Sequence, residues 1–189
     1  MTRLELSLFP GTVTEAAADT IIALIPEDER PLRGDAGRID WRLCGRISEQ
    51  LRSGYVSGEP GEAVLLPAGA PLLAARVLLV GVGRQQSLGE GRPLLRAMRA
   101  AADKLLALRS PSAMLAWPGS VDFSTDAVSL LRGMVHSLQN ASEDAVLHVI
   151  LPSAEPCEKA LLSALSEVVP GAHSWGIEVD VNWIEPAQA

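Results

Sequence analysis

The sequence has few of the residues that build disulfide frameworks, metal centres or membrane spans. It contains two cysteines, Cys44 and Cys157, and three histidines among 189 residues. Two cysteines are too few for a disulfide framework or a zinc site, and both fall in helical patterns where buried thiols are expected. No apolar run approaches the ~18 residues of a membrane span, and the first residues do not form a signal peptide. We therefore expect a protein of the reducing cytoplasm that uses no metal or cofactor and contacts no membrane.

Charge is unevenly distributed along the chain. Residues 1–109 carry 14 basic and 13 acidic side chains, whereas residues 110–189 carry 2 basic and 10 acidic ones. The acidic C-terminal part would repel phosphates, which argues against a nucleic-acid partner. Its surplus predicts either a solvated surface that aids solubility or a docking face for a basic partner.

Composition and pattern predict one domain over residues 1–189. Hydrophobic residues make up 48% and charged residues 21% of the chain, as in a protein that buries a core. Apolar runs predict strands at Thr20–Ile25, Glu62–Leu66, Ala75–Val80, Ser112–Trp117 and Ala145–Leu151. Alternation of polar and apolar residues predicts strands at Leu4–Leu8 and Ile177–Trp183, the last with one buried and one solvent-facing side. A helical period predicts helices over Gly37–Ser53, over Arg92–Leu108, over Thr125–Leu138, and from Pro156 to just before Pro170. This alternation predicts an α/β fold with a mixed, largely parallel central sheet, helices on both faces, and antiparallel edges at the first and last strands.

Three stretches in order carry a family resemblance. They are Ala18–Ile25, Gly61–Pro67 and Arg76–Gly83, the last followed by an alanine-rich helix. Over residues 18–117 this set resembles the N-terminal domain of leucyl aminopeptidases, and the resemblance implies a macro-domain-like fold. In that family a separate C-terminal domain holds two divalent metals, lysines, carboxylates and an Asn-Thr-Asp-Ala-Glu-Gly-Arg type motif. No such motif occurs in the sequence, so the resemblance implies a domain that is not an enzyme and has no catalytic or metal residues.

A cryptic hydrolase is the least favoured function. A two-metal site needs several converging carboxylate or imidazole ligands. The acidic pairs at residues 27–29 and 143–144 lie in polar turns without a nearby histidine. The three histidines are isolated in sequence: His136, His148 and His173. His148 lies in an apolar strand, where a hydrogen-bonded core histidine is expected.

A small-ligand sensor is the second hypothesis. Gly81, Gly83 and Arg84 follow a buried strand, where backbone N–H groups and an arginine can face an anion at the strand ends. The alternative is a tight turn beneath a packed helix. Macro domains that bind ADP-ribose typically carry asparagines where this chain has Pro26 and Glu27, so tight ADP-ribose binding is not expected.

The favoured function is a non-catalytic interaction, scaffold or regulatory module. The predicted helix has an apolar stripe of Ile39, Leu43, Ile47 and Leu51. Trp41 lies opposite the middle of this stripe, and Arg38 and Arg42 lie on a flank. An exposed tryptophan is a frequent interface anchor, although packing against a neighbouring loop is an equal alternative. One expected partner is a separate protein, for example a separately encoded aminopeptidase-type catalytic subunit. The other is a second copy of the chain, whose acidic residues 110–189 would contact the helix surface that carries Trp41, Arg38 and Arg42.

Overall fold

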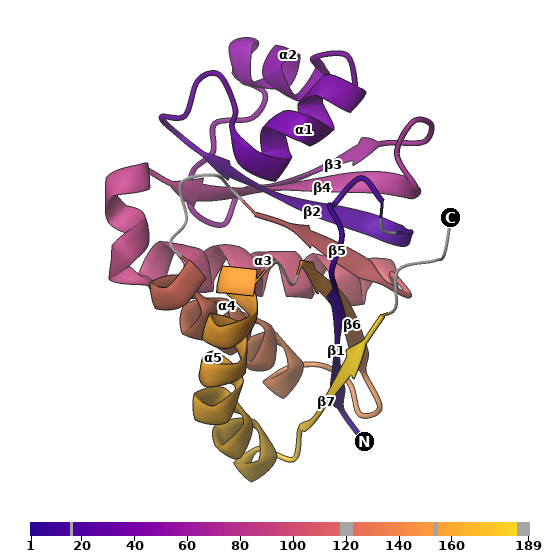
Figure 1. Ribbon diagram of the computed structural model, residues 1–189, viewed down its shortest axis with the longest axis vertical. Coiled ribbons are helices and arrows are strands. Elements are labelled where there is room, and N and C mark those ends of the chain that lie inside the picture. Colours follow the sequence, from indigo (N-terminus) through magenta and orange to yellow (C-terminus); the bar gives the residue numbers. More distant parts are fainter. Residues whose placement is uncertain (16, 118–122, 153–154, 185–189) are drawn as a thin grey trace.

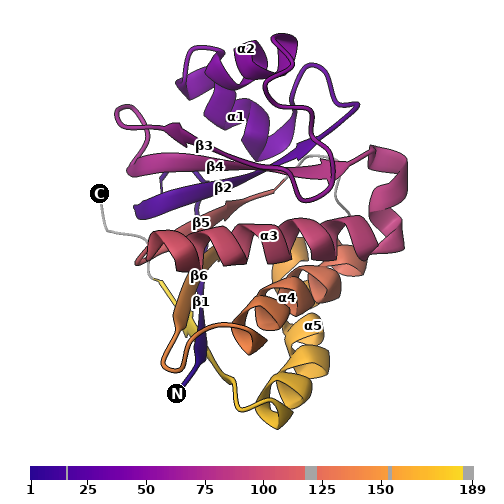
Figure 2. The ribbon, with the colours of Figure 1, turned by 180° about the vertical axis from the view of Figure 1, so that it is seen from behind.

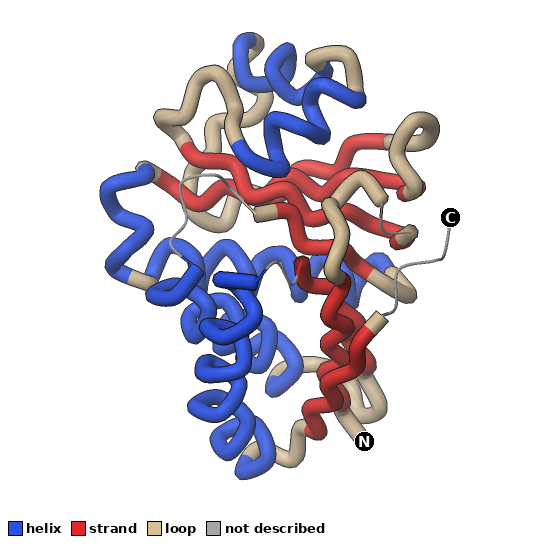
Figure 3. Tube along the Cα trace, viewed as in Figure 1, coloured by secondary structure: helices blue, strands red, loops and turns tan. Residues whose placement is uncertain are grey.

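A mixed seven-stranded sheet forms the centre of the molecule. The computed structural model describes residues 1–15, 17–117, 123–152 and 155–184, apart from the side chains of residues 123–125 and 155–157. Within them the strands are β1 (Arg3–Phe9), β2 (Ala18–Pro26), β3 (Ala63–Pro67), β4 (Ala74–Gly83), β5 (Ala113–Ala116), β6 (Val146–Pro152) and β7 (Glu178–Trp183). Their order is β3-β4-β2-β5-β6-β1-β7, and every neighbouring pair is parallel except β3 and β4 (Figure 1). Figure 3 shows the strands in red with the helices in blue around them. The predicted largely parallel α/β sheet is confirmed.

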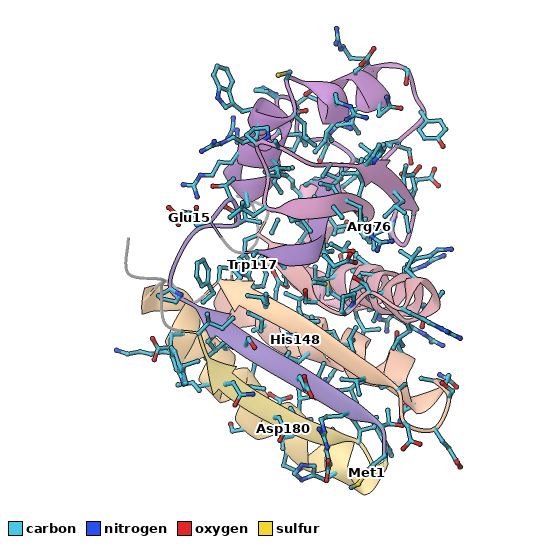
Figure 4. All side chains as sticks on the ribbon, turned by 90° about the vertical axis from the view of Figure 1, so that its right-hand side faces the viewer. Met1, Glu15, Arg76, Trp117, His148 and Asp180 are labelled. Atoms are coloured by element: carbon cyan, nitrogen blue, oxygen red, sulfur yellow. The ribbon has the colours of Figure 1, made fainter. Side chains whose placement is uncertain are left out.

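Helices pack on both faces of this sheet. They are α1 (Gly34–Arg42), α2 (Arg46–Arg52), the short 3-10 helix η1 (Gln85–Glu90), α3 (Arg92–Leu108), α4 (Phe123–Gln139) and α5 (Glu155–Ser174). Figures 1 and 2 show α1 and α2 on one side, over β2, β3 and β4, and the three long helices on the other. The second face of β6, β1 and β7 has no helix over it and presents polar side chains, His148 and Asp180 among them (Figure 4).

The two helix layers meet at strand β2. Its residues Ile21 to Ile25 are fully buried, with Ile22 and Leu24 packed toward α3 and α4 and the alternate side chains packed toward α1. A strand covered on both faces reads as an unbroken apolar run, which is why this strand was predictable.

The last strand lies at an edge of the sheet as predicted, although it is parallel, whereas the first strand does not lie at an edge. β1 is internal and pairs in parallel with both β6 and β7, while β7 is a parallel edge; the antiparallel edge is β3. β3 and β4 are joined by a short turn, and a parallel pair would need a long crossover. The predicted dry face of β7 is also wrong at its end, because Val181 is 37% exposed and Trp183 is 55% exposed.

The last helix passes through a proline that was predicted to end it. α5 continues beyond Pro170 to Ser174. Proline removes one intrahelical hydrogen bond, to the carbonyl of Ser166. Both residues are exposed, so water can solvate that carbonyl and the helix continues.

The half-buried carboxylate of Asp19 links three segments at the amino ends of the strands. Asp19 accepts hydrogen bonds from Arg76 Nη2 (3.0 and 2.9 Å), from Thr20 Oγ1 (3.1 Å) and from Ser110 Oγ. Burial would raise the pKa of Asp19, but the bonds from Ser110, Arg76 and Thr20 and the charge of Arg76 outweigh it and hold the pKa below its usual range. Asp19 therefore links β2 to β4 and to the turn that precedes β5.

We predict that Asp19→Asn lowers the free energy of unfolding at neutral pH by about 1–3 kcal/mol, because charge-assisted bonds are lost. A depressed folded-state pKa contributes stability above the unfolded-state value of about 3.9, and this contribution disappears as pH falls through the folded-state pKa. Urea titrations should show the gap between wild type and variant closing below about pH 4. The exposed Asp103→Asn is the control, and a gap that stays constant with pH would contradict the assignment.

Candidate interaction face around Trp41

The predicted helix Gly37–Ser53 is two helices separated by a sharp break. Cys44 and Gly45 both have positive φ (55° and 82°), which ends α1 and redirects the chain into α2. Cys44 lies in this break and is exposed, so its prediction as a buried helical thiol is wrong. The Cys157 side chain lies outside the described residues.

Asp40 stabilises the break from within. Its carboxylate accepts hydrogen bonds from the backbone N–H of Ile47 (2.8 Å) and of Ser48 (3.1 Å), and from the Ser48 hydroxyl. A carboxylate on the first-turn amides of α2 satisfies donors that have no intrahelical partner and complements the helix dipole. Asp40 thus performs for α2 the role of an N-cap, from a position seven residues before Ile47.

Asp35 anchors the start of α1 to the central sheet. Its backbone N–H donates to the Trp117 carbonyl (3.0 Å), and its carboxylate accepts from the Trp117 N–H (3.1 Å), directly after β5. The same carboxylate forms an ion pair with Arg38 (3.2 Å). Asp35 therefore fixes α1 on the sheet and orients one arginine of the predicted face.

The predicted inward and outward sides of this region are confirmed. Ile39, Leu43 and Ile47 are buried despite the break between the two helices, and Leu51 is partly buried against the same core. Trp41 points away from them and is 84% exposed. A packing role for the indole against a neighbouring loop does not fit this exposure, and leaving it in water forgoes about 1.5–3 kcal/mol of burial.

Trp41 stands as a ridge between two hollows. One hollow, of ≈ 540 Å³, lies between the loop after β1 and the start of α1. Its polar lining comes from Thr12, Thr14, Arg33, Arg38 and Arg42. The other, of ≈ 510 Å³, lies on the α2 side and is lined by Pro31, Leu32, Asp40, Cys44 and Ser48. Trp41 borders both hollows, and we call Trp41 with Arg33, Arg38 and Arg42 the Trp41 face.

The Trp41 face has surplus positive charge. Arg38 is neutralised by Asp35, whereas Arg33 and Arg42 have no carboxylate within 4.0 Å among the described residues. Glu15 follows Thr14, which lines the first hollow. The hydrogen bond from the Thr12 amide, at 2.7 Å, holds the pKa of the Glu15 carboxyl below its usual range, and the charge of Arg38 has a smaller effect in the same direction. Two free guanidinium groups beside an exposed indole favour an acidic partner with an apolar side chain.

The glycine segment Gly81–Gly83 is part of β4 and lies under the segment that precedes β3. A Cβ at Gly81 would come within 2.0 Å of the Glu59 carbonyl oxygen, so only glycine permits this close approach. The Gly81 N–H donates to the Glu62 carbonyl (2.8 Å), and the Gly83 N–H donates to the Gly58 carbonyl (2.8 Å). These two backbone donors are thus engaged within the chain.

Acidic side chains occupy the strand ends next to Arg84. Arg84 pairs with Glu27 (3.5 Å), and the Gln85 N–H at the start of η1 donates to the carboxylate of Asp28 (3.0 Å). Glu29 is buried and accepts from the Gln85 side chain (2.8 Å). The position that an anion would take is therefore already filled by carboxylates, although anion binding at Gly81, Gly83 and Arg84 stays an untested prediction.

The described part of the chain contains no group of three or more His, Cys, Asp or Glu side chains arranged to hold a metal ion. His148 is half-buried on the helix-free sheet face and hydrogen-bonds to Ser7 Oγ (2.9 Å). His136 packs edge-on against Trp175. Among the described residues, no helix has the length and apolar character needed to cross a bilayer.

Comparison with solved structures defines the class. A macrodomain mutant of Oceanobacillus iheyensis superposes with a TM-score of 0.66 and 15% identity, covering 87% of this chain and 92% of that chain. Tomato leucine aminopeptidase superposes with a TM-score of 0.60 and 16% identity, covering 86% of this chain but 36% of that one. The fold is that of a macrodomain-like α/β domain.

Sequence comparison then defines the family. The profile of the cytosol aminopeptidase family, N-terminal domain, matches residues 21–144. A probable cytosol aminopeptidase of Pseudomonas fluorescens is 31% identical over 132 residues, which are 70% of this chain and 26% of that protein. One from Methylobacillus flagellatus is 33% identical over 98 residues, or 52% of this chain and 19% of that protein. The chain belongs to the cytosol aminopeptidase family through its N-terminal domain, and it spans about a quarter or less of these relatives.

Asp35 and Asp40, which position the Trp41 face, were not predicted from the sequence. We predict that Asp40→Ala lowers the free energy of unfolding by about 2 kcal/mol, because the amides of Ile47 and Ser48 lose their acceptor. Asp40→Asn should cost less, since both N–H groups donate to Oδ1, which the asparagine amide retains as an acceptor. Urea denaturation measures both, with exposed Asp103→Asn in α3 as the control. Equal stabilities for Asp40→Ala and wild type would contradict this role.

Proposed function

We propose that this chain acts as a non-catalytic protein-interaction module of the cytosol aminopeptidase family, with the Trp41 face as its contact surface. The observation that carries the proposal is Trp41 itself, 84% exposed on a helix that Asp35 and Asp40 hold rigidly. Hot spots of protein interfaces are rich in tryptophan and arginine, and a rigid support lowers the entropic cost of binding. The proposal places the chain in the cytoplasm, as the name of its relatives suggests.

The partner in this proposal is an acidic segment of another protein with a bulky apolar side chain. The apolar side chain would enter a hollow beside Trp41, and the carboxylates would meet Arg33 and Arg42. Arginine binds carboxylates in a bidentate manner, which gives orientation as well as attraction. A separately encoded aminopeptidase catalytic subunit is one protein that can be examined for such a segment.

A second copy suits the Trp41 face less well. The acidic residues 110–189 include Glu167, which pairs with Arg132 (2.7 Å), and Glu178 and Asp180, which both pair with Arg3 (3.3 and 3.4 Å). These carboxylates are partly neutralised within their own chain. A head-to-tail contact would exchange existing ion pairs for new ones, with little net gain.

The small-ligand sensor is the second candidate. Its support is the fold, because the similar O. iheyensis macrodomain has been solved with ADP and with ADPR. In this chain Pro26, Glu27 and Asp28 occupy the strand end, and the nearby backbone donors already have acceptors. The interaction module therefore stands first.

For the Trp41 face, we expect acidic peptides selected from a random library on the immobilised protein to bind in a salt-sensitive manner. Fluorescence anisotropy should show that Trp41→Ala costs about 2 kcal/mol of binding free energy, as expected for an interface hot spot. The double variant Arg33→Glu/Arg42→Glu should reduce the salt dependence together with the affinity.

The matched control is Trp175→Ala, which removes another exposed tryptophan outside the Trp41 face. It should leave the affinity unchanged. Selected peptides that bind Trp41→Ala as tightly as wild type would sink the proposal. Peptides derived from residues 110–189 of this chain serve as the probe for the head-to-tail alternative.

We further predict that the 189-residue chain does not hydrolyse leucine-p-nitroanilide when Mn²⁺ or Zn²⁺ is added. The physical reason is that a two-metal hydrolase needs converging ligands, and the described residues supply no such group. A full-length cytosol aminopeptidase in the same assay is the positive control. A rate that copurifies with the chain and is abolished by a chelator would refute the non-catalytic assignment.

A further inference from the structure

The two edges of the sheet are not equally protected. On β3, residues whose backbone groups bond to β4 alternate with residues whose backbone N–H and C=O groups point away from the sheet. The outward-pointing residues are Ala63, Leu65 and Pro67. Pro67 has no N–H to offer, and its carbonyl accepts a hydrogen bond from Arg46 Nη1 (3.2 Å). A proline and a covering arginine are typical devices that block edge-to-edge pairing.

Among the described residues, the edge at β7 has no proline and no arginine bonded to its outward carbonyls, and its charged residues Glu178 and Asp180 pair with Arg3 of the neighbouring strand. The N–H group of Glu178 donates to the Thr2 carbonyl (3.0 Å), and the N–H group of Ile184 donates to the Leu8 carbonyl (2.9 Å). The backbone N–H and C=O groups of the even-numbered residues of β7 therefore point toward β1. By alternation, the N–H and C=O groups of Val179, Val181 and Trp183 point outward along the edge. The apolar side chains of Val181 and Trp183 are exposed there.

We propose that β7 pairs antiparallel with β7 of a second copy about a two-fold axis at Val181. The observed backbone directions restrict the possible registers, because hydrogen-bonded pairs must join two outward-facing, odd-numbered residues. Centring the axis on Val181 pairs Val179 with the partner's Trp183 and makes Val181 its own counterpart. This register uses every residue from Glu178 to Ile184 and joins the two sheets into one.

Charge selects this register over its neighbours. An axis at Asp180 would place two aspartates opposite each other, and an axis at Val179 would place Glu178 opposite Asp180; both pair like charges. An axis at Asn182 shortens the ladder to Asp180–Ile184. With the axis at Val181, Asp180 faces the partner's Asn182, whose amide can donate a hydrogen bond to the carboxylate.

The apolar face of this ladder is equally complementary. Aromatic and β-branched side chains opposite each other are favourable cross-strand pairs, and here Trp183 meets Val179 on both sides of the axis. A two-fold interface of this kind closes at two copies and does not use the Trp41 face.

The mass from size-exclusion chromatography with light scattering tests the pairing. Wild type is expected to be a dimer, and Val181→Lys should raise the dissociation constant on the order of tenfold or more, because two ammonium groups would face each other. Leu65→Lys makes the same kind of change on the protected edge, where Leu65 is 42% exposed, and should leave the dimer intact. Trp41→Ala should also remain a dimer, which separates this contact from the proposed function.

Cysteine crosslinking tests the register. In a Cys44→Ser/Cys157→Ser background, Val181→Cys brings two Cα atoms to about 5.5 Å, within disulfide reach. The single variants Val179→Cys and Trp183→Cys place like residues about 14 Å apart and should not crosslink. A monomer at all concentrations, a dimer insensitive to Val181→Lys, or crosslinking at 179 as fast as at 181 would each overturn the proposal.

Discussion

The burial of β2 on both faces is the constraint on which the rest of the fold depends. Ile22 and Leu24 pack into the core on the α3–α4 side, and Ile21, Ala23 and Ile25 pack into the core under α1. At about 25 cal/mol per Å² of apolar surface, neither side of such a strand can be left to water. The strand must lie in the sheet interior, with helices above and below, so two helix layers follow from one segment.

That constraint explains what could be predicted from the sequence. β2 and β4 are continuous apolar runs and were predicted close to their observed bounds, and α3 spans Arg92–Leu108 as predicted. The stripe Ile39, Leu43 and Ile47 was predicted as buried, and Trp41 as facing away. In each case the signal is local. A hydrophobic period of 2 or 3.6 residues, or an unbroken apolar run, indicates which side of a strand or helix is buried.

The misses share the opposite property. Nothing local places β1 between β6 and β7, because sheet order depends on how distant segments pack. The stripe continues through Leu43 into Ile47 and conceals the break at Cys44 and Gly45, which depends on Asp40 reaching forward to α2. The Asp35–Trp117 pair joins residues far apart in sequence. Sequence spacing alone therefore assigns no role to the carboxylate of Asp35 or to that of Asp40.

The loop between β2 and α1 connects the carboxyl ends of the strands to the Trp41 face. In this domain the segment after β2 turns its carboxylates inward: Asp28 caps the start of η1, and Glu29 accepts from Gln85 and from the Arg33 N–H (3.3 Å). These bonds lie at the carboxyl ends of the strands, where a parallel α/β sheet ordinarily takes a ligand. They also fix the backbone of Arg33, which leaves its guanidinium on the outer surface beside Trp41. Carboxylates at the strand ends thus hold the outer surface of α1 in place, and this rigid support is the physical basis of the contact role proposed for that surface.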